Sequence, residues 1–169
     1  MTKFVEILPE EIGGNVFQKI GREWMLITAG NQTEFNTMTA SWGGMGCMWN
    51  ANVAAAVVRP SRHTYGFMEK EDYFTLSFLG GGFRRALQLC GTLSGRDTDK
   101  VAEAGLTPRF DTPAPYFDEA ELVLVCRKMY TQDLDPAKFL DSTIESHYKG
   151  SDYHRLYVGE IVKVLQKAE

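Results

Sequence analysis

Two arginines and two hydroxyl residues lie close together in residues 59–64, whose sequence is RPSRHT. A guanidinium group binds phosphate oxygens through paired N–H donors, and a hydroxyl adds a further donor. The intervening proline biases Arg59 toward an extended conformation, so a strand is expected to end there. Ser61 is a favoured N-cap residue for a helix over Arg62–Glu71, and the start of a helix attracts anions. The sequence therefore predicts a phosphate site formed by Arg59, Ser61, Arg62 and Thr64.

The stretch before this turn predicts the strands that position it. Residues 38–44, MTASWGG, form an apolar strand pattern interrupted by glycine, and residues 52–58 form a second β-rich run. Gly43, Gly44 and Gly46 remove side chains from this β segment, and glycine inside a strand often marks close approach by a ligand or another backbone. The alternative is that the two arginines are ordinary solvated charges beside a capped helix. The glycine-bearing strand favours the phosphate site.

The rest of the chain reads as β-structure with a few short helices. Strands are expected at 24–29, 73–79, 121–130 and 153–165, and helical patterns at 9–21 and 83–89. The polar loop 90–100 precedes a further helix, which Asp97 or Thr98 can cap and Gly105 can end. Six or seven strands without regular β-α-β alternation favour an antiparallel barrel over a doubly wound sheet.

Composition sets the class of protein. The chain has 169 residues with 44% hydrophobic content, which suits a single domain over residues 1–169 with a full core. The formal net charge of -4 argues against nucleic-acid or anionic-membrane partners, which require a basic surface. No apolar run is long enough to span a bilayer and no signal-peptide pattern is present, so a cytoplasmic protein is expected.

Cysteine and histidine usage predicts neither disulfides nor a metal site. Cys47, Cys90 and Cys126 are odd in number and far apart, and each is expected to be a reduced, buried, small apolar residue. The three histidines show no metal-ligand spacing.

Four motifs in order, TASWGG, RPSRHT, CGTLSGRDTDK and HRLYVGEI, make the chain resemble the flavin reductase-like branch of the FMN-binding split-barrel proteins, which includes flavoredoxins. The resemblance covers nearly the whole chain. It implies a mainly β fold, a six-stranded antiparallel split barrel with Greek-key connections and short flanking helices. It also implies a homodimer with FMN near the subunit interface. The implied activity is electron transfer, as an NAD(P)H:flavin reductase or a flavoredoxin, with NAD(P)H as the electron donor and a redox protein as a further partner.

The resemblance also implies which residues bind the cofactor. The first motif would lie along the flavin ring and ribityl chain, the second would hold the phosphate, and the third would reach the cofactor from its loop, with Arg96 and Asp97 shaping that loop. No catalytic residue is expected, because hydride transfer to flavin requires stacking and exclusion of water rather than a titrating side chain. The implied cofactor-binding residues are Thr39, Ala40, Ser41, Trp42, Trp49, Arg59, Ser61, Arg62, Thr64, Ser94, Gly95, Lys100 and His154, the last as a contact across the dimer.

Several alternatives stay open at this point. Trp49 fits a core or interface position as well as a flavin contact, and Lys100 fits a solvated helix position. The same fold could hold FMN without turnover, as a store or a sensor. It could instead hold haem through His63 or His154, although the paired arginines favour a phosphate ligand.

Overall fold

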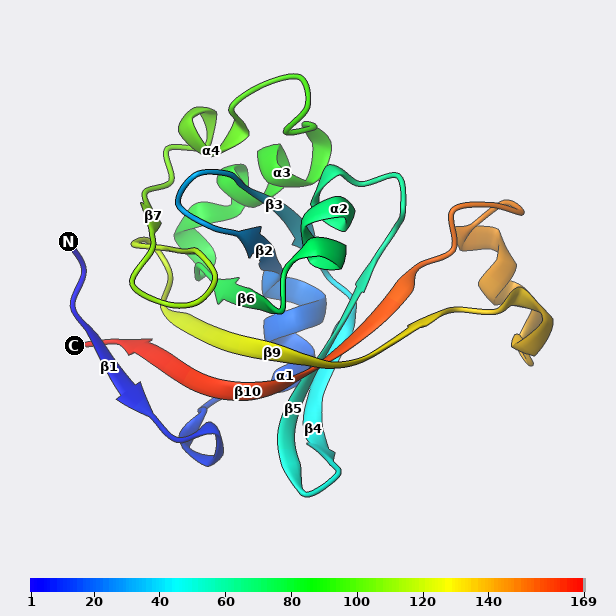
Figure 1. The fold of residues 1–169 in the computed structure, drawn as a ribbon, viewed down its shortest axis with the longest axis horizontal. Coiled ribbons are helices and arrows are strands. Elements are labelled where there is room, and N and C mark those ends of the chain that lie inside the picture. Colours follow the sequence, from blue (N-terminus) through cyan, green and yellow to red (C-terminus); the bar gives the residue numbers. More distant parts are fainter. Residues whose placement is uncertain (169) are drawn as a thin grey trace.

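The computed structural model describes residues 1–168 and consists mainly of one strongly curled antiparallel sheet with short helices outside it (Figure 1). The strands are β1 (Phe4–Ile7), β2 (Met25–Gly30), β3 (Phe35–Ala40), β4 (Gly43–Met48), β5 (Ala51–Val58), β6 (Tyr73–Phe78), β7 (Pro108–Arg109), β8 (Tyr116–Phe117), β9 (Leu122–Asp133) and β10 (Arg155–Lys167). The helices and helical turns are η1 (Pro9–Glu11), α1 (Val16–Gln18), η2 (Lys19–Glu23), α2 (His63–Lys70), η3 (Gly81–Phe83), α3 (Arg84–Thr92), α4 (Lys100–Glu103), η4 (Pro136–Lys138) and η5 (Ser142–His147).

The order of the strands makes the sheet an open barrel. The hydrogen-bonded order is β3-β2-β6-β9-β10-β5-β4, and β1 pairs with β10. β3 and β4 are therefore at opposite ends of the sheet, yet only Ser41 and Trp42 separate them in the chain. The sheet must curl until its two edges meet, and within residues 1–168 those edges are not paired with each other. The predicted mainly β split barrel is confirmed. Counting β3 and β4 as one bent strand gives six strands along the main path, and β1 adds a seventh beside β10.

Two apolar clusters lie on the two faces of the sheet. Leu122, Leu124 and Cys126 share one face of β9, as the alternation predicts, and belong to the cluster inside the barrel. Val123 and Val125 point the other way into a second cluster, which α3 and the small β7–β8 sheet cover. The central strands are thus buried on both faces, and this rigid sheet supports the segments at its split edge.

The expected single strand over 38–44 is two strands. Gly43 has a φ of 149°, and a Cβ atom there would lie 2.4 Å from the Ala55 carbonyl oxygen. The close approach at this glycine is therefore made by the backbone of β5. A Cβ atom at Gly44 or Gly46 would meet open space, so no other backbone of residues 1–168 approaches these two glycines on that side.

Several helix boundaries differ from those that the sequence patterns predict. α2 begins at His63 with Arg62 at the N-cap position, so the prediction of Ser61 as N-cap is wrong. α3 continues to Thr92, and Asp99 rather than Asp97 or Thr98 caps α4 by accepting a hydrogen bond from the Ala102 amide.

The cysteine prediction holds in part. Cys90 and Cys126 are buried, whereas Cys47 is exposed on β4 at the edge of the sheet, contrary to expectation. Over the described residues, none of the helices combines the length and the apolar character that crossing a membrane demands. No group of three or more metal-binding side chains occurs in that part of the chain either.

Candidate functional site

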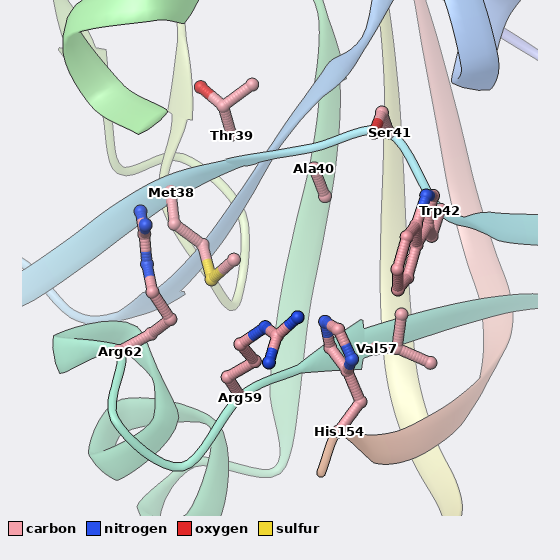
Figure 2. A pocket seen from close by; sticks show the side chains of 9 residues that line it. All are labelled: Met38, Thr39, Ala40, Ser41, Trp42, Val57, Arg59, Arg62 and His154. Carbon is pink, nitrogen blue, oxygen red and sulfur yellow. The ribbon is translucent and has the colours of Figure 1, made fainter. Parts of the chain in front are cut away.

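A pocket of about 220 Å³ lies beside the split edge of the barrel (Figure 2). β3 and the two residues after it form one wall, and the end of β5 with the turn after it forms a second. His154, directly before β10, closes the third side. The lining residues are Met38, Thr39, Ala40, Ser41, Trp42, Val57, Arg59, Arg62 and His154.

The β3 wall is fixed from both of its sides. Met38 and Ala40 point into the barrel core. The hydroxyl of Thr39 points the other way and donates a hydrogen bond to the Leu87 carbonyl of α3, at 2.5 Å. Because residues i and i+2 share a face of a strand, this alternation holds β3 between the core and α3. The wall that the ligand would contact is therefore preorganised.

Two cations, the buried Lys100 and the partly buried Arg62, meet at the C-terminal end of α3. The guanidinium of Arg62 donates to the carbonyls of Gly91 and Cys90, at 2.8 and 3.2 Å. The ammonium of Lys100 donates to the same Cys90 carbonyl and to that of Leu93, each at 3.2 Å. Within residues 1–168, neither cation forms a salt bridge.

Burial acts on both charges, and repulsion by Arg62 acts on Lys100 as well. Burial lowers the pKa of Arg62, and burial together with the nearby Arg62 charge lowers the pKa of Lys100 to about 8. Both groups still carry a proton at neutral pH. Carbonyl dipoles at a helix C-terminus compensate a cation only in part. Uncompensated positive charge beside the pocket favours an anionic ligand.

Arg59 and Ser61 hold the long connection between β9 and β10, residues 134–153, which we call the strap (Figure 1). The Arg59 guanidinium donates to the carbonyls of His147 and Asp152, at 2.8 and 3.2 Å, and lies 4.8 Å from the centre of the Tyr148 ring. The amide and hydroxyl of Ser61 both donate to the Asp152 carboxylate, at 3.0 and 2.6 Å. Of the predicted phosphate residues, Ser61 thus already binds a carboxylate of this chain, and Arg59 binds two backbone carbonyls of the strap.

His154 lies at the root of the strap and points toward Arg59 in the pocket (Figure 2). Its Nδ1 atom is 2.8 Å from the Tyr148 hydroxyl, and its ring is 5.1 Å from that of Trp42. Burial, followed by the nearby Arg59 charge, lowers the pKa of His154 to about 4. The ring is therefore neutral at pH 7.

The pocket brings together seven of the thirteen sequence-predicted residues. Ser61 lies next to it but faces Asp152. Thr64 is fully buried, and its hydroxyl accepts a hydrogen bond from the Asn36 amide at 2.7 Å, which ties α2 to β3. The seven lining residues are Thr39, Ala40, Ser41, Trp42, Arg59, Arg62 and His154.

The third motif lies at a neighbouring cavity of about 540 Å³, which both Gly95 and Lys100 line. Ser94 shapes the loop by accepting a hydrogen bond from the Arg96 amide, and the Arg96 guanidinium donates to the Ser61 carbonyl, both at 3.2 Å. Lys100 is only 3% exposed, so its interpretation as a solvated helix residue is wrong.

Trp49 lies away from both cavities, at the tip of the β4–β5 hairpin. It is 56% exposed, and its ring centre is 6.2 Å from that of Tyr130. This position fits the interface alternative for Trp49 rather than contact with a ligand in the pocket of its own chain.

Sequence reasoning missed the pocket residues Met38 and Val57 and the strap residues that contact the site. Strand alternation next to Thr39 and Arg59 was a usable signal for the first two. No motif marked His147, Tyr148 or Asp152, because they reach the site only through the tertiary fold.

The fold and the site define a split-barrel protein with a pocket suited to an anionic ligand. Residues 17–169 match the family model described as the flavin reductase like domain, and the chain belongs to this family. A comparison with curated protein sequences gave no significant match.

Several solved structures share the fold. An FMN-binding domain of a flavin reductases-like enzyme from Shewanella baltica OS155 has a TM-score of 0.70 and 14% identity, over 98% of this chain and 78% of that one. Flavoredoxin from Methanosarcina acetivorans has a TM-score of 0.69 and 21% identity, over 86% and 68%. An FMN-binding protein from Thermus thermophilus has a TM-score of 0.66 and 21% identity, over 85% and 71%. At these identities the likeness concerns the fold.

Proposed function

We propose that the protein binds FMN in the pocket at the split edge and acts as an electron-transferring oxidoreductase of the flavin reductase type. The observation that carries the proposal is a pair of cations, the partly buried Arg62 and the buried Lys100, which share one carbonyl beside the pocket. Membership in the flavin reductase-like family supports the assignment. The FMN-binding descriptions of the Shewanella and Thermus structures support the choice of FMN.

The residues present fit an FMN molecule. Thr39, Ala40, Ser41 and Trp42 would lie along the ring and the ribityl chain, and Arg59 and Arg62 would hold the phosphate. Ser61, Ser94, Gly95 and Lys100 would complete the site from the turn and from the neighbouring loop, while the buried Thr64 anchors the turn through Asn36. The hydroxyls of Ser61 and Thr64 have protein partners, so the two guanidiniums are the main phosphate donors.

Bound FMN would supply the redox chemistry, and the chain would bind and orient it. The residues that line the pocket include no carboxylate, and His154 is neutral. The side chains are therefore suited to binding a ring and a phosphate and to excluding water. They are not suited to acid or base catalysis. We further propose NADH or NADPH as the electron donor and a redox protein as a further partner.

The spectrum of the purified protein tests this function. We expect a flavin absorption band as isolated or after addition of FMN, and bleaching of that band on anaerobic mixing with NADH or NADPH. FMN binding without bleaching by either nucleotide would favour a store or sensor. A Soret band would favour haem instead, and a protein that binds no flavin would refute the proposal.

We also propose a homodimer that uses the apolar tip of the β4–β5 hairpin. Met48, Trp49 and Tyr130 are 46%, 56% and 43% exposed, which leaves large apolar side chains in water. Burial of such side chains between two chains is favourable.

Light scattering should give the mass of two chains, and Trp49→Ser should shift the measured mass toward that of one chain. Leu140→Ser, on the fully exposed strap residue, is the matched control and should leave the mass unchanged.

A further inference from the structure

The carboxylate of Asp152 occupies donors that a phosphate would also use. It accepts hydrogen bonds from both the amide and the hydroxyl of Ser61. Two donors from one serine, directed at two oxygens of one anion, resemble the way in which a turn at the start of a helix holds a phosphate oxygen pair. Asp152 therefore acts as an internal anion at the turn between β5 and α2.

The backbone is arranged to place this carboxylate. Lys149, Gly150 and Asp152 all have positive φ values, of 53°, 83° and 57°. A left-handed conformation is unfavourable for residues other than glycine and persists only where surrounding contacts compensate for it. The contacts of Asp152 with Ser61 and Arg59 provide that compensation. The turn at the end of the strap is thus held in place by the phosphate residues themselves.

The strap has few other attachments to the barrel. Of residues 134–153 only Tyr148 is buried, and Leu140 is fully exposed. The strap packs mainly on itself, where the Phe139 ring lies 5.9 Å from both Tyr148 and Tyr153. Segments with little buried surface open at low free-energy cost. Release of Arg59 and Ser61 would leave the strap held mainly by the contacts of His147 with Trp42 and of Tyr148 with His154.

We propose that the strap is an autoinhibitory latch, in which Asp152 competes with the FMN phosphate, through its carboxylate for Ser61 and through its backbone carbonyl for Arg59. This inference rests on the proposed binding of FMN. Two groups that require the same donors oppose each other's binding, and the opposition is reciprocal. Binding of FMN therefore releases the strap, and a closed strap weakens the binding of FMN. Riboflavin has the same ring and no phosphate, so its binding leaves the latch closed.

Hydrogen–deuterium exchange on the full chain measures the first half of this coupling. We expect amides of residues 134–153 to exchange faster with FMN bound, on the order of tenfold, and to be unchanged with riboflavin. This direction is opposite to the protection that ligands usually give. Slower or unchanged exchange of the strap with FMN bound would overturn the latch.

Flavin titrations measure the second half. Asp152→Asn removes the charge, keeps the shape and tolerates the left-handed backbone. We expect it to tighten FMN binding on the order of tenfold and to leave riboflavin binding unchanged. Asp135→Asn removes one charge elsewhere on the strap, where the Asp135 carboxylate accepts a hydrogen bond from the nearby Ala137 amide, and should change neither affinity. Equal effects of Asp152→Asn on both flavins, or none, would overturn the latch.

These outcomes separate the two proposals. Binding of FMN and riboflavin with no coupling to the strap would overturn the latch and leave the proposed function standing. Binding of neither flavin would overturn both. Circular dichroism of the Asp152→Asn variant, compared with that of the original protein, establishes that each titration is made on a folded chain.

Discussion

Replacement of Arg62 by alanine should weaken FMN binding by about 1.5 to 3 kcal/mol, the contribution of a hydrogen bond to a charged group. The guanidinium is one of two that line the pocket, and it has no carboxylate partner within residues 1–168. A phosphate dianion would be its strongest partner. The Kd from quenching of flavin fluorescence should rise roughly tenfold to 150-fold.

Two controls isolate the phosphate contact. Riboflavin affinity should change little in the Arg62→Ala variant, because riboflavin lacks the phosphate. Arg85→Ala removes an exposed guanidinium from α3, away from the pocket, and should leave FMN affinity unchanged. Arg62 also caps α3 through two carbonyls, so the free energy of unfolding should fall as well. An unchanged FMN affinity in the folded variant would contradict the assignment.

The second large effect is a loss of stability in acid that depends on His154. Its pKa is about 4 in the folded protein and about 6.5 in an unfolded chain. Between these values the unfolded chain binds more protons, so stability rises with pH across this window and falls as the solution is acidified. At 1.36 kcal/mol for each unit, the loss from pH 7 to pH 4 is at most about 3 kcal/mol.

Urea unfolding of the original protein and of His154→Gln at pH 7 and pH 4.5 measures this loss. Glutamine does not titrate, so the variant should lose less stability between the two pH values, by up to about 2 to 3 kcal/mol. Titrating carboxylates contribute to both proteins and cancel in the comparison. Equal losses in the two proteins would show that His154 is not held neutral by the fold.

The sequence was sufficient for the features that depend on local pattern. Alternation along residues 121–130 located β9 and assigned Leu122, Leu124 and Cys126 to one face. Pro60 predicted the end of β5, which stops at Val58, one residue before Arg59. The motif order also placed Arg59 and Arg62 at a common site, because the turn that carries them is short.

The features that the sequence did not predict depend on contacts between distant residues. Ser61 is a good N-cap by residue type, but its hydroxyl and its amide donate hydrogen bonds to Asp152, which is 91 residues away. Thr64 has a hydroxyl that could bind phosphate, but in the fold this hydroxyl is buried and accepts a hydrogen bond from Asn36. Cys47 has apolar neighbours in sequence, yet it lies on an edge strand that leaves it exposed. No local pattern reports which partner a polar side chain will find.

The split between β3 and β4 has a consequence for the main chain. Ser41 and Trp42 belong to neither the β2–β3 nor the β4–β5 ladder. A closed barrel would satisfy each of its peptide groups from within, whereas an interrupted one leaves some of them for an outside partner. A flat heterocycle bound there would supply hydrogen-bond partners for the peptide groups between β3 and β4. Loading of such a molecule should then raise the resistance of the whole barrel to unfolding, in proportion to the logarithm of its concentration.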